Sequence, residues 1–342
     1  MPYRILTLIA AVMMALTMNP ARAERNLQRP PGTTRYAPML DRLRALAAYD
    51  HDQGSGRMTL GSIGKSWKGR DLWMVTLHDP TVDPAATKRI VYICRQHGHE
   101  PASTEAALSF VDTLVHADSQ SALGACLRAV TVYIIPMANP DGAERFLRHN
   151  AHDIDINRDW LKQTQPETRA LMSAIKQIRP DEITDQHELF PDDRRGDFTE
   201  AAGPDAGCAP GVTETCEELS EVVRLSMWTQ GCPVRTTLID DRHPAKLAHR
   251  YGSLVAGIPT ILFETNRTPG RGRSVADRAK AHERFMTIIL RDAAGERNEL
   301  LAEAQAAGVG HVRQPAANPP LAAIDPDSQA TPDASDPDME GQ

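Results

Sequence analysis

Apolar residues recur along the chain in two alternating patterns. Short runs rich in apolar and β-branched residues, such as 89–94 and 260–263, are typical of buried strands. Segments with apolar residues three or four positions apart, such as 36–49 and 102–115, are typical of helices. The other predicted strands are 58–60, 71–77, 128–135, 182–186 and 234–238, and the other predicted helices are 167–177, 217–229, 245–255 and 275–290.

This alternation of strands and helices predicts an α/β fold in which helices cover both faces of a sheet. The 342 residues, 41% hydrophobic and 24% charged, have an ordinary globular composition. Their number is sufficient for one large domain or two small ones.

The two ends of the chain differ from its middle. Arg4 precedes an apolar segment, 5–16, that is short for a membrane span, and Ala21-Arg22-Ala23 fits a small-x-small cleavage site. We expect residues 1–23 to be a signal peptide and the mature protein to be periplasmic or secreted, without a membrane span; a retained anchor is the alternative. Residues 306–342, rich in Pro, Ala and Asp, are expected to be a disordered tail, which leaves 24–305 as the folded domain.

Charge and cysteine content narrow the function further. The net charge of −7 and the absence of a basic stripe argue against nucleic acid as a partner. Five cysteines follow the predicted cleavage site, and an odd number in an exported protein leaves at least one thiol free or paired between chains. Cys94 lies in an apolar run and is expected to be a buried thiol. Cys208 and Cys216 could form a disulfide across a short loop, although the sequence leaves the pairing open.

The first candidate for chemistry is the stretch 95–101, which joins the predicted strand 89–94 to the helix 102–115. Ligands of open α/β sheets bind where strands end. His97 and Glu100 are spaced so that an imidazole and a carboxylate can reach one Zn²⁺, but a catalytic zinc needs a third protein ligand and an open position. A surface His–Glu pair is the alternative.

Other polar residues follow the ends of other predicted strands. His187 comes after 182–186 and is a candidate third ligand, with a structural histidine as the alternative. Glu264 follows 260–263 and could act as a general base, or be a surface carboxylate. Arg148, Asn157 and Arg158 could hold a substrate carboxylate, or belong to a solvated charged loop.

The order and spacing of these pieces resemble the M14 family of zinc carboxypeptidases from about residue 36 to residue 292. The matching pieces are His97-x-x-Glu100, Asn139-Pro140-Asp141-Gly142, Arg148, Asp155-x-Asn157-Arg158, His187 and Glu264, with 63–70 similar to an early segment of the family's domain. The resemblance implies a single domain with a mixed, largely parallel central sheet flanked by helices.

The resemblance also implies a role for each residue. His97, Glu100 and His187 would bind one Zn²⁺ per chain, and Asp155 would accept a hydrogen bond from His97. Glu264 would be the general base for a metal-activated water. Arg148 would stabilise the oxyanion, and Asn157 and Arg158 would bind the terminal carboxylate.

The implied activity is hydrolysis of the C-terminal amide bond of peptides by an exported enzyme. The alternatives are a carboxypeptidase for peptidoglycan stem peptides, a related deacylase, and a catalytically inactive binding module on the same scaffold. Tyr251 is close in sequence to where a closing tyrosine would be expected, but its register does not fit and it receives no role. His99 is expected to face solvent or support the site, and a specificity pocket is expected between about residues 243 and 263.

Overall fold

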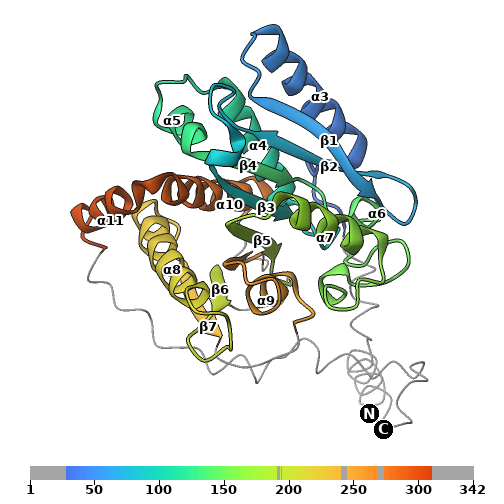
Figure 1. Ribbon diagram of the computed structural model, residues 1–342. Helices are drawn as coiled ribbons and strands as arrows, with labels where there is room; N and C mark the ends of the chain where they lie inside the picture. Colours follow the sequence, from blue (N-terminus) through green and yellow to red (C-terminus); the bar gives the residue numbers. More distant parts are fainter. Residues whose placement is uncertain (1–27, 191–192, 194, 240–244, 268–272, 310–342) are drawn as a thin grey trace, which may run out of the picture. The chain divides into compact units, whose positions relative to one another are not determined.

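The computed structural model describes residues 28–309, apart from 191–192, 194, 240–244 and 268–272. The predicted signal peptide and most of the predicted tail lie outside the described residues, as does the start of the predicted specificity pocket. The described chain forms one eight-stranded sheet in the order β1-β2-β4-β3-β5-β8-β6-β7, drawn in Figure 1.

The strands are β1 (Met58–Lys65), β2 (Asp71–Leu77), β3 (Lys88–Cys94), β4 (Val130–Ile135), β5 (Glu182–Glu188), β6 (Phe198–Ala202), β7 (Arg235–Ile239) and β8 (Thr260–Thr265). The helices are α3 (Tyr36–Asp52), α4 (Ala102–His116), α5 (Ala122–Ala129), α6 (Pro140–Arg145), α7 (Pro166–Ile178), α8 (Val212–Thr229), α9 (Ala248–Leu254), α10 (Val275–Arg291) and α11 (Arg297–Ala306). Short helical turns span Pro84–Ala86, Ile156–Arg158 and Asp292–Glu296.

The sheet is mixed and largely parallel, which confirms the predicted fold class. The pairs β3–β4, β3–β5, β5–β8 and β6–β7 are parallel, whereas β1–β2, β2–β4 and β6–β8 are antiparallel. Because the central strands β3, β5 and β8 run in one direction, the segments that follow them meet at one edge of the sheet.

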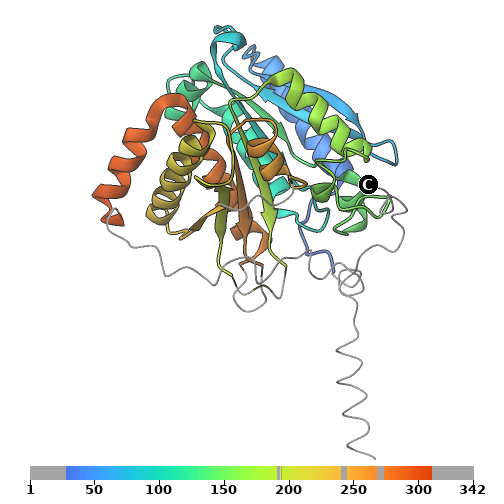
Figure 2. The same cartoon turned by 60° about the horizontal axis from the view of Figure 1, so that its bottom comes forward.

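Helices cover both faces of the sheet (Figures 1 and 2). On one face α4, α8 and α10 pack over the larger core, and on the other α7 and α9 pack over a smaller one. Strand β3 serves both cores: Ile90 and Tyr92 belong to the first, and Val91 and Ile93 to the second. The unbroken apolar run 90–94 is therefore the sequence signature of a strand buried on both faces.

Every predicted strand and helix exists in the structure; the strand 71–77 has the bounds of β2, and the other elements differ at one or both ends. The predicted strand 128–135 begins too early, since α5 continues to Ala129 and β4 starts at Val130. β5 and β8 each extend beyond their predicted ends, so His187 and Glu264 lie within strands. The sequence analysis missed β6, α5, α6 and α11; β6 is only five residues long and carries Glu200 in its middle, which hides its strand pattern.

Glu182 is a buried carboxyl group at the start of β5, far along the strand from His187. It is 4% exposed, and its Oε2 accepts no hydrogen bond from the described residues. Burial, and next the negative charge of Asp292, raises the pKa of Glu182 to about 7. Since folding raises this pKa, ionisation of Glu182 opposes folding.

We therefore expect Glu182→Gln to stabilise the protein at pH 8. The penalty in the parent grows as pH rises from about 4.5 to 7 and then stays constant, so the two chains should differ by roughly 1–3 kcal/mol at pH 8 and little at pH 4.5, because each pKa unit is worth about 1.4 kcal/mol. Urea unfolding at both pH values measures this difference. Glu299→Gln, at an exposed position on α11, is the control. A parent that is the more stable chain at pH 8 would contradict the interpretation.

Candidate metal and catalytic site

Three side chains converge where β3 and β5 end. Nδ1 of His97 lies 2.9 Å from Oε1 of Glu100, and Nδ1 of His187 lies 2.9 Å from Oε2 of the same carboxylate. The two Nδ1 atoms are 3.0 Å apart. All three residues are buried, with exposures of 1–4%. The structure thus brings together the three ligands that the sequence predicted.

The opposite nitrogen of each imidazole faces a carboxylate. Nε2 of His97 lies 3.1 Å from Oδ1 of Asp155, and Nε2 of His187 lies 2.8 Å from Oδ1 of Asp185. A ring that binds a metal through Nδ1 carries its proton on Nε2, where Asp155 and Asp185 can accept it. The two Nδ1 atoms then point at each other and at Glu100, which is the arrangement of a metal site.

Zinc fits this donor set. Two imidazole nitrogens and one carboxylate are a known catalytic zinc set, and ligand atoms around a tetrahedral zinc lie about 3.3–3.6 Å apart for bonds of about 2.0–2.2 Å. The two Nδ1 atoms, and each Nδ1 and its nearer Glu100 oxygen, therefore lie only about half an ångström closer than ligand atoms around a bound zinc. Burial alone would lower the pKa of His187, but Asp185 and Glu100 outweigh it and raise this pKa well above its usual range, which shows the demand for positive charge.

The loop that carries His97 is shaped by its neighbours. Arg95 has a left-handed backbone, with φ of 57°, and its buried guanidinium donates to the carbonyl of Gly98. Gly98 lies against α6 so closely that a Cβ would sit 2.0 Å from the carbonyl carbon of Gly142. Glycine at position 98 therefore allows the metal loop and α6 to pack backbone to backbone.

Asn139 joins this loop to the following segment. Its Nδ2 donates to the carbonyls of Gln96 (3.0 Å) and Arg148 (3.2 Å), and its Oδ1 accepts from the backbone of Gly142 (2.8 Å) as the N-cap of α6. Asp141, also buried, accepts from Arg70 in the turn between β1 and β2. The segment 139–142 is thus more than a turn, because it hydrogen bonds to the loop of His97, to the backbone of Arg148 and to the turn between β1 and β2.

Arg148 lies at the side of the ligand cluster. Its Nε donates to Oδ2 of Asp155 at 2.9 Å, and its Nη1 is 3.8 Å from Oε1 of Glu100. The guanidinium also stacks over Phe190, 5.1 Å from the ring centre. Asp155 therefore contacts both His97 and Arg148, which confirms the predicted contact to His97 and extends it.

Glu264 stands beside His187 on the neighbouring strand. The two residues are register partners in the parallel β5–β8 pair, so their side chains leave the sheet on the same face. Oε2 of Glu264 is buried and accepts no hydrogen bond within the described chain. Burial is the main cause that raises the pKa of Glu264 to about 8.

Asn157 and Arg158 lie next to this cluster in the turn that follows Asp155. The amide of Asn157 is 3% exposed; its Nδ2 is 3.1 Å from Nε2 of His187, and its Oδ1 accepts from the backbone of Ala248. Arg158 is half-buried and its Nη1 donates to the carbonyl of Asn157. The predicted contact of both residues with a substrate carboxylate stays a prediction.

Several other sequence predictions concern residues near the site. His99 is fully buried against Arg267, so the expectation that it faces solvent was wrong. Cys208 and Cys216 are both free thiols, which contradicts the suggested disulfide, while Cys94 is the expected buried thiol. Tyr251 packs beside Trp160 with the smaller core.

The sequence analysis missed the residues that hold His187. Oδ1 of Asp185 accepts from Nε2 of His187 and also from Nε2 of Gln96 at 2.6 Å, and Trp160 donates to the other end of the Gln96 amide at 2.8 Å. One signal was present, since residues two apart on a strand share a face and Asp185 is two positions before His187. No comparable signal pointed to Trp160.

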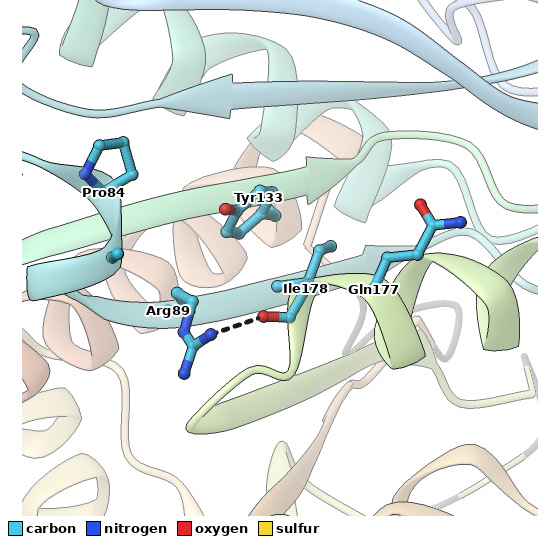
Figure 3. Close-up of a pocket in the computed structure, with 6 residues that line it drawn as sticks. Pro84, Arg89, Tyr133, Gln177 and Ile178 are labelled. Atoms are coloured by element: carbon cyan, nitrogen blue, oxygen red, sulfur yellow. Dashed lines mark hydrogen bonds between the residues drawn. The ribbon is translucent and has the colours of Figure 1, made fainter.

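A shallow groove lies elsewhere on the molecule, away from the ligand cluster. Figure 3 shows its lining: Arg89 donates to the carbonyl of Ile178, with Tyr133, Gln177 and Pro84 around them. It lies where β3 begins, whereas the ligand cluster lies where β3 ends. The groove is therefore separate from the candidate site.

We expect His187→Ala to lose zinc while the sheet remains folded, because the two remaining ligands leave the ion without its third protein donor. Metal analysis after dialysis, together with circular dichroism, measures both properties. His149→Ala is the control, since His149 follows Arg148 but hydrogen bonds only Asp153 among the described residues. Full zinc occupancy in His187→Ala would remove His187 from the ligand set.

Comparison with known proteins agrees with this geometry. Residues 44–188 match the family model described as zinc carboxypeptidase, Peptidase_M14. The chain is 33% identical to carboxypeptidase SOL1 of Arabidopsis thaliana over 131 residues, which are 35% of this chain and 27% of the relative. It is also 33% identical to a zinc carboxypeptidase of Saccharothrix mutabilis subsp. capreolus over 116 residues, 33% of this chain and 25% of the relative.

The chain thus matches about a quarter of the length of these curated relatives. Its fold matches the crystal structure of a metallo-carboxypeptidase from Burkholderia cenocepacia with a TM-score of 0.63 at 22% identity, over 75% of this chain and 69% of that one. This likeness extends the shared fold beyond the matched residues. The segment 44–188, which carries His97, Glu100, Arg148 and His187, therefore matches the zinc carboxypeptidase family model, within a fold that is shared with a metallo-carboxypeptidase.

Proposed function

We propose that this chain is a zinc-dependent carboxypeptidase that hydrolyses the C-terminal amide bond of peptides. One observation carries the proposal: the ligand cluster of His97, Glu100 and His187 lies beside a carboxyl group, Glu264, and a guanidinium, Arg148, at one edge of the sheet. A bare structural zinc site would need neither of these two groups. The family match of residues 44–188 supports the same reaction class.

Glu264 is the proposed general base. Zinc, when bound, supplies Lewis-acid polarisation and lowers the pKa of water toward about 7. The carboxylate of Glu264 removes the proton from the attacking water and returns it to the leaving amine. A pKa that burial raises to about 8 suits both steps, since a catalytic group works best with a pKa near the working pH.

Arg148 is the proposed group that stabilises negative charge on the substrate carbonyl oxygen. Its guanidinium lies next to Glu100 and His97, and the hydrogen bond from Nε to Asp155 holds its position before substrate arrives. A fixed positive charge in a partly desolvated site stabilises a developing oxyanion without reorganising.

Arg158 is the proposed anchor for the terminal carboxylate. It is half-buried, and arginine binds carboxylates through two parallel hydrogen bonds. Asn157 supports it, because Ala248 fixes the Asn157 amide and the Asn157 carbonyl accepts from Arg158. This anchor distinguishes an exopeptidase from an endopeptidase or deacylase.

Export is part of the proposal. The apolar segment 5–16 and the small residues Ala21 and Ala23 support it. Within the described part of the chain, no helix has the length and apolar character that crossing a bilayer requires. In a bacterial envelope, a peptidoglycan stem peptide would offer the same terminal carboxylate, so it is the second candidate substrate.

We expect Glu264→Gln to keep zinc and the fold but to reduce turnover at least about 100-fold, because an amide accepts no proton from water. Steady-state hydrolysis of a peptide with a free C-terminus, with zinc analysis of the same sample, measures this. Glu214→Gln, on α8, is the control. Near-normal turnover in Glu264→Gln would assign the base to another group.

We expect a peptide with a free C-terminus to be cleaved much faster than its C-terminal amide. Charge-assisted hydrogen bonds are about twice as strong as neutral ones, and an amide would leave Arg158 without its charged partner. Arg158→Ala should erase most of this preference by slowing cleavage of the free acid. Mass spectrometry of products from matched acid and amide peptides, and from soluble muropeptides, gives the rates.

The control is Arg128→Ala, because Arg128 is exposed at the end of α5 and donates only to a backbone carbonyl among the described residues. It should keep the preference of the parent. Equal rates on acid and amide in the parent would exclude the exopeptidase and favour an endopeptidase or deacylase. Zinc binding without any hydrolysis would favour a binding module.

A further inference from the structure

A second buried histidine lies behind the proposed zinc ligand His187. His249, on α9, is 2% exposed, and its Nε2 lies 2.8 Å from Oε1 of Glu200 on β6, which is 5% exposed. Its other nitrogen, Nδ1, faces Oδ2 of Asp185 at 3.9 Å. The residues Asp185, His249 and Glu200 therefore form a line that starts at His187 and ends two strands away.

The contact between Asp185 and His249 involves two atoms that have no other hydrogen-bond partner among the described residues. Oδ1 of Asp185 is used twice, by His187 and Gln96, but Oδ2 accepts no hydrogen bond within the described chain. Nδ1 of His249 is likewise buried without a hydrogen bond to any described residue. Leaving two complementary buried groups unsatisfied is costly, and a shift of about 1 Å would bring them to hydrogen-bond distance.

The sheet geometry explains why these residues share one face. Asp185 and His187 are two apart on β5, so both point to the face that α9 covers. Glu200 pairs with Leu262 on β8, and Leu262 pairs with Asp185 on the other side. The three strands therefore present Asp185, Leu262 and Glu200 side by side beneath α9, and His249 bridges the two carboxylates over Leu262.

We propose that His249 is a positioning residue for the zinc site: it donates through Nδ1 to Asp185, and Glu200 holds it in place. Asp185 is then restrained through both oxygens, and it in turn fixes the ring and the proton of His187. Outer partners of metal-bound histidines commonly change metal affinity 10- to 100-fold. The charge balance agrees, since burial alone would lower the pKa of His249 but Asp185 and Glu200 outweigh it and raise this pKa.

This inference rests on the proposed zinc site, and its test measures the metal directly. His249→Leu removes both donors at similar volume and should weaken zinc binding about tenfold, the low end for an outer partner. His249→Asn keeps a donor in reach of Asp185 and should recover most of the loss. The readouts are the zinc dissociation constant by competition with a chromophoric chelator, the rate of zinc release into EDTA, and the visible spectrum of the Co²⁺-substituted protein.

His282→Leu is the matched control. His282 is fully buried on α10 against the opposite face, where it contacts Gln186 and Thr265. It should leave zinc affinity, release rate and the Co²⁺ spectrum unchanged. If His249→Leu does not fold, Glu200→Gln tests the same line of residues, and it should speed zinc release in the same direction.

The outcomes distinguish a failure of the proposed function from a failure of the inference about His249. A parent chain that binds no zinc would overturn the proposed function and this inference together. A parent that binds zinc and cleaves peptides, with His249→Leu equal to the parent and to His282→Leu in all three readouts, would overturn the inference alone. If His249→Leu cannot be assayed, an unchanged zinc release rate in Glu200→Gln would overturn it.

Discussion

The candidate site depends on two carboxylates that lie behind the proposed metal ligands: Asp185, which is buried, and Asp155, whose side chain is 12% exposed. Asp155 and Asp185 each lie at the far nitrogen of one imidazole, where they can accept the Nε2 proton of a ring whose Nδ1 faces Glu100. Without these contacts, neither ring would favour the tautomer that leaves Nδ1 free to bind a metal. Asp155 also accepts a hydrogen bond from Arg148, so the same carboxylate restrains a proposed ligand and the group proposed to stabilise the oxyanion.

The sheet supplies the rest of the geometry. Parallel pairing of β3, β5 and β8 brings the metal loop, His187 and Glu264 to one edge, although these residues are separated by up to 167 positions in the chain. The precise position of the loop then depends on a close backbone contact. Gly98 touches α6, and Asn139 bonds the loop, α6 and the carbonyl of Arg148, so a change at either position would move several functional groups together.

The sequence was informative where a local pattern carried the information. The runs 90–94 and 260–263 are strands because they are buried on both faces, and His97-x-x-Glu100 sits at a strand end where ligands gather. The strand β6 was not predicted, because Glu200 interrupts the apolar pattern of a strand of only five residues. The Glu200 carboxylate contacts His249, 49 positions away, and a contact between residues so far apart in the chain produces no local sequence pattern.

The difference between local patterns and long-range contacts also explains which residues of the site were predicted and which were missed. Asp185 could have been recognised from its spacing to His187, but Gln96, Trp160 and His249 act through tertiary contacts alone. His99 was expected to face solvent or support the site because of its spacing from its neighbours. The fold buries it because Arg267 donates to its backbone carbonyl and contacts its ring, which offsets the loss of water.

The carboxylates around the two imidazoles show why a cation suits this cluster. Glu100 and Asp185 are buried and Asp155 is nearly so, and the positive groups that contact them include Arg148 and His249. Uncompensated charges at this depth cost several kcal/mol each. A Zn²⁺ bound by His97, Glu100 and His187 would add positive charge where these carboxylates gather. In the proposed reaction, the negative charge that develops on the substrate would then lie beside Arg148, whose position Asp155 restrains. The carboxylates would therefore act on both the metal ligands and the group proposed to stabilise the oxyanion.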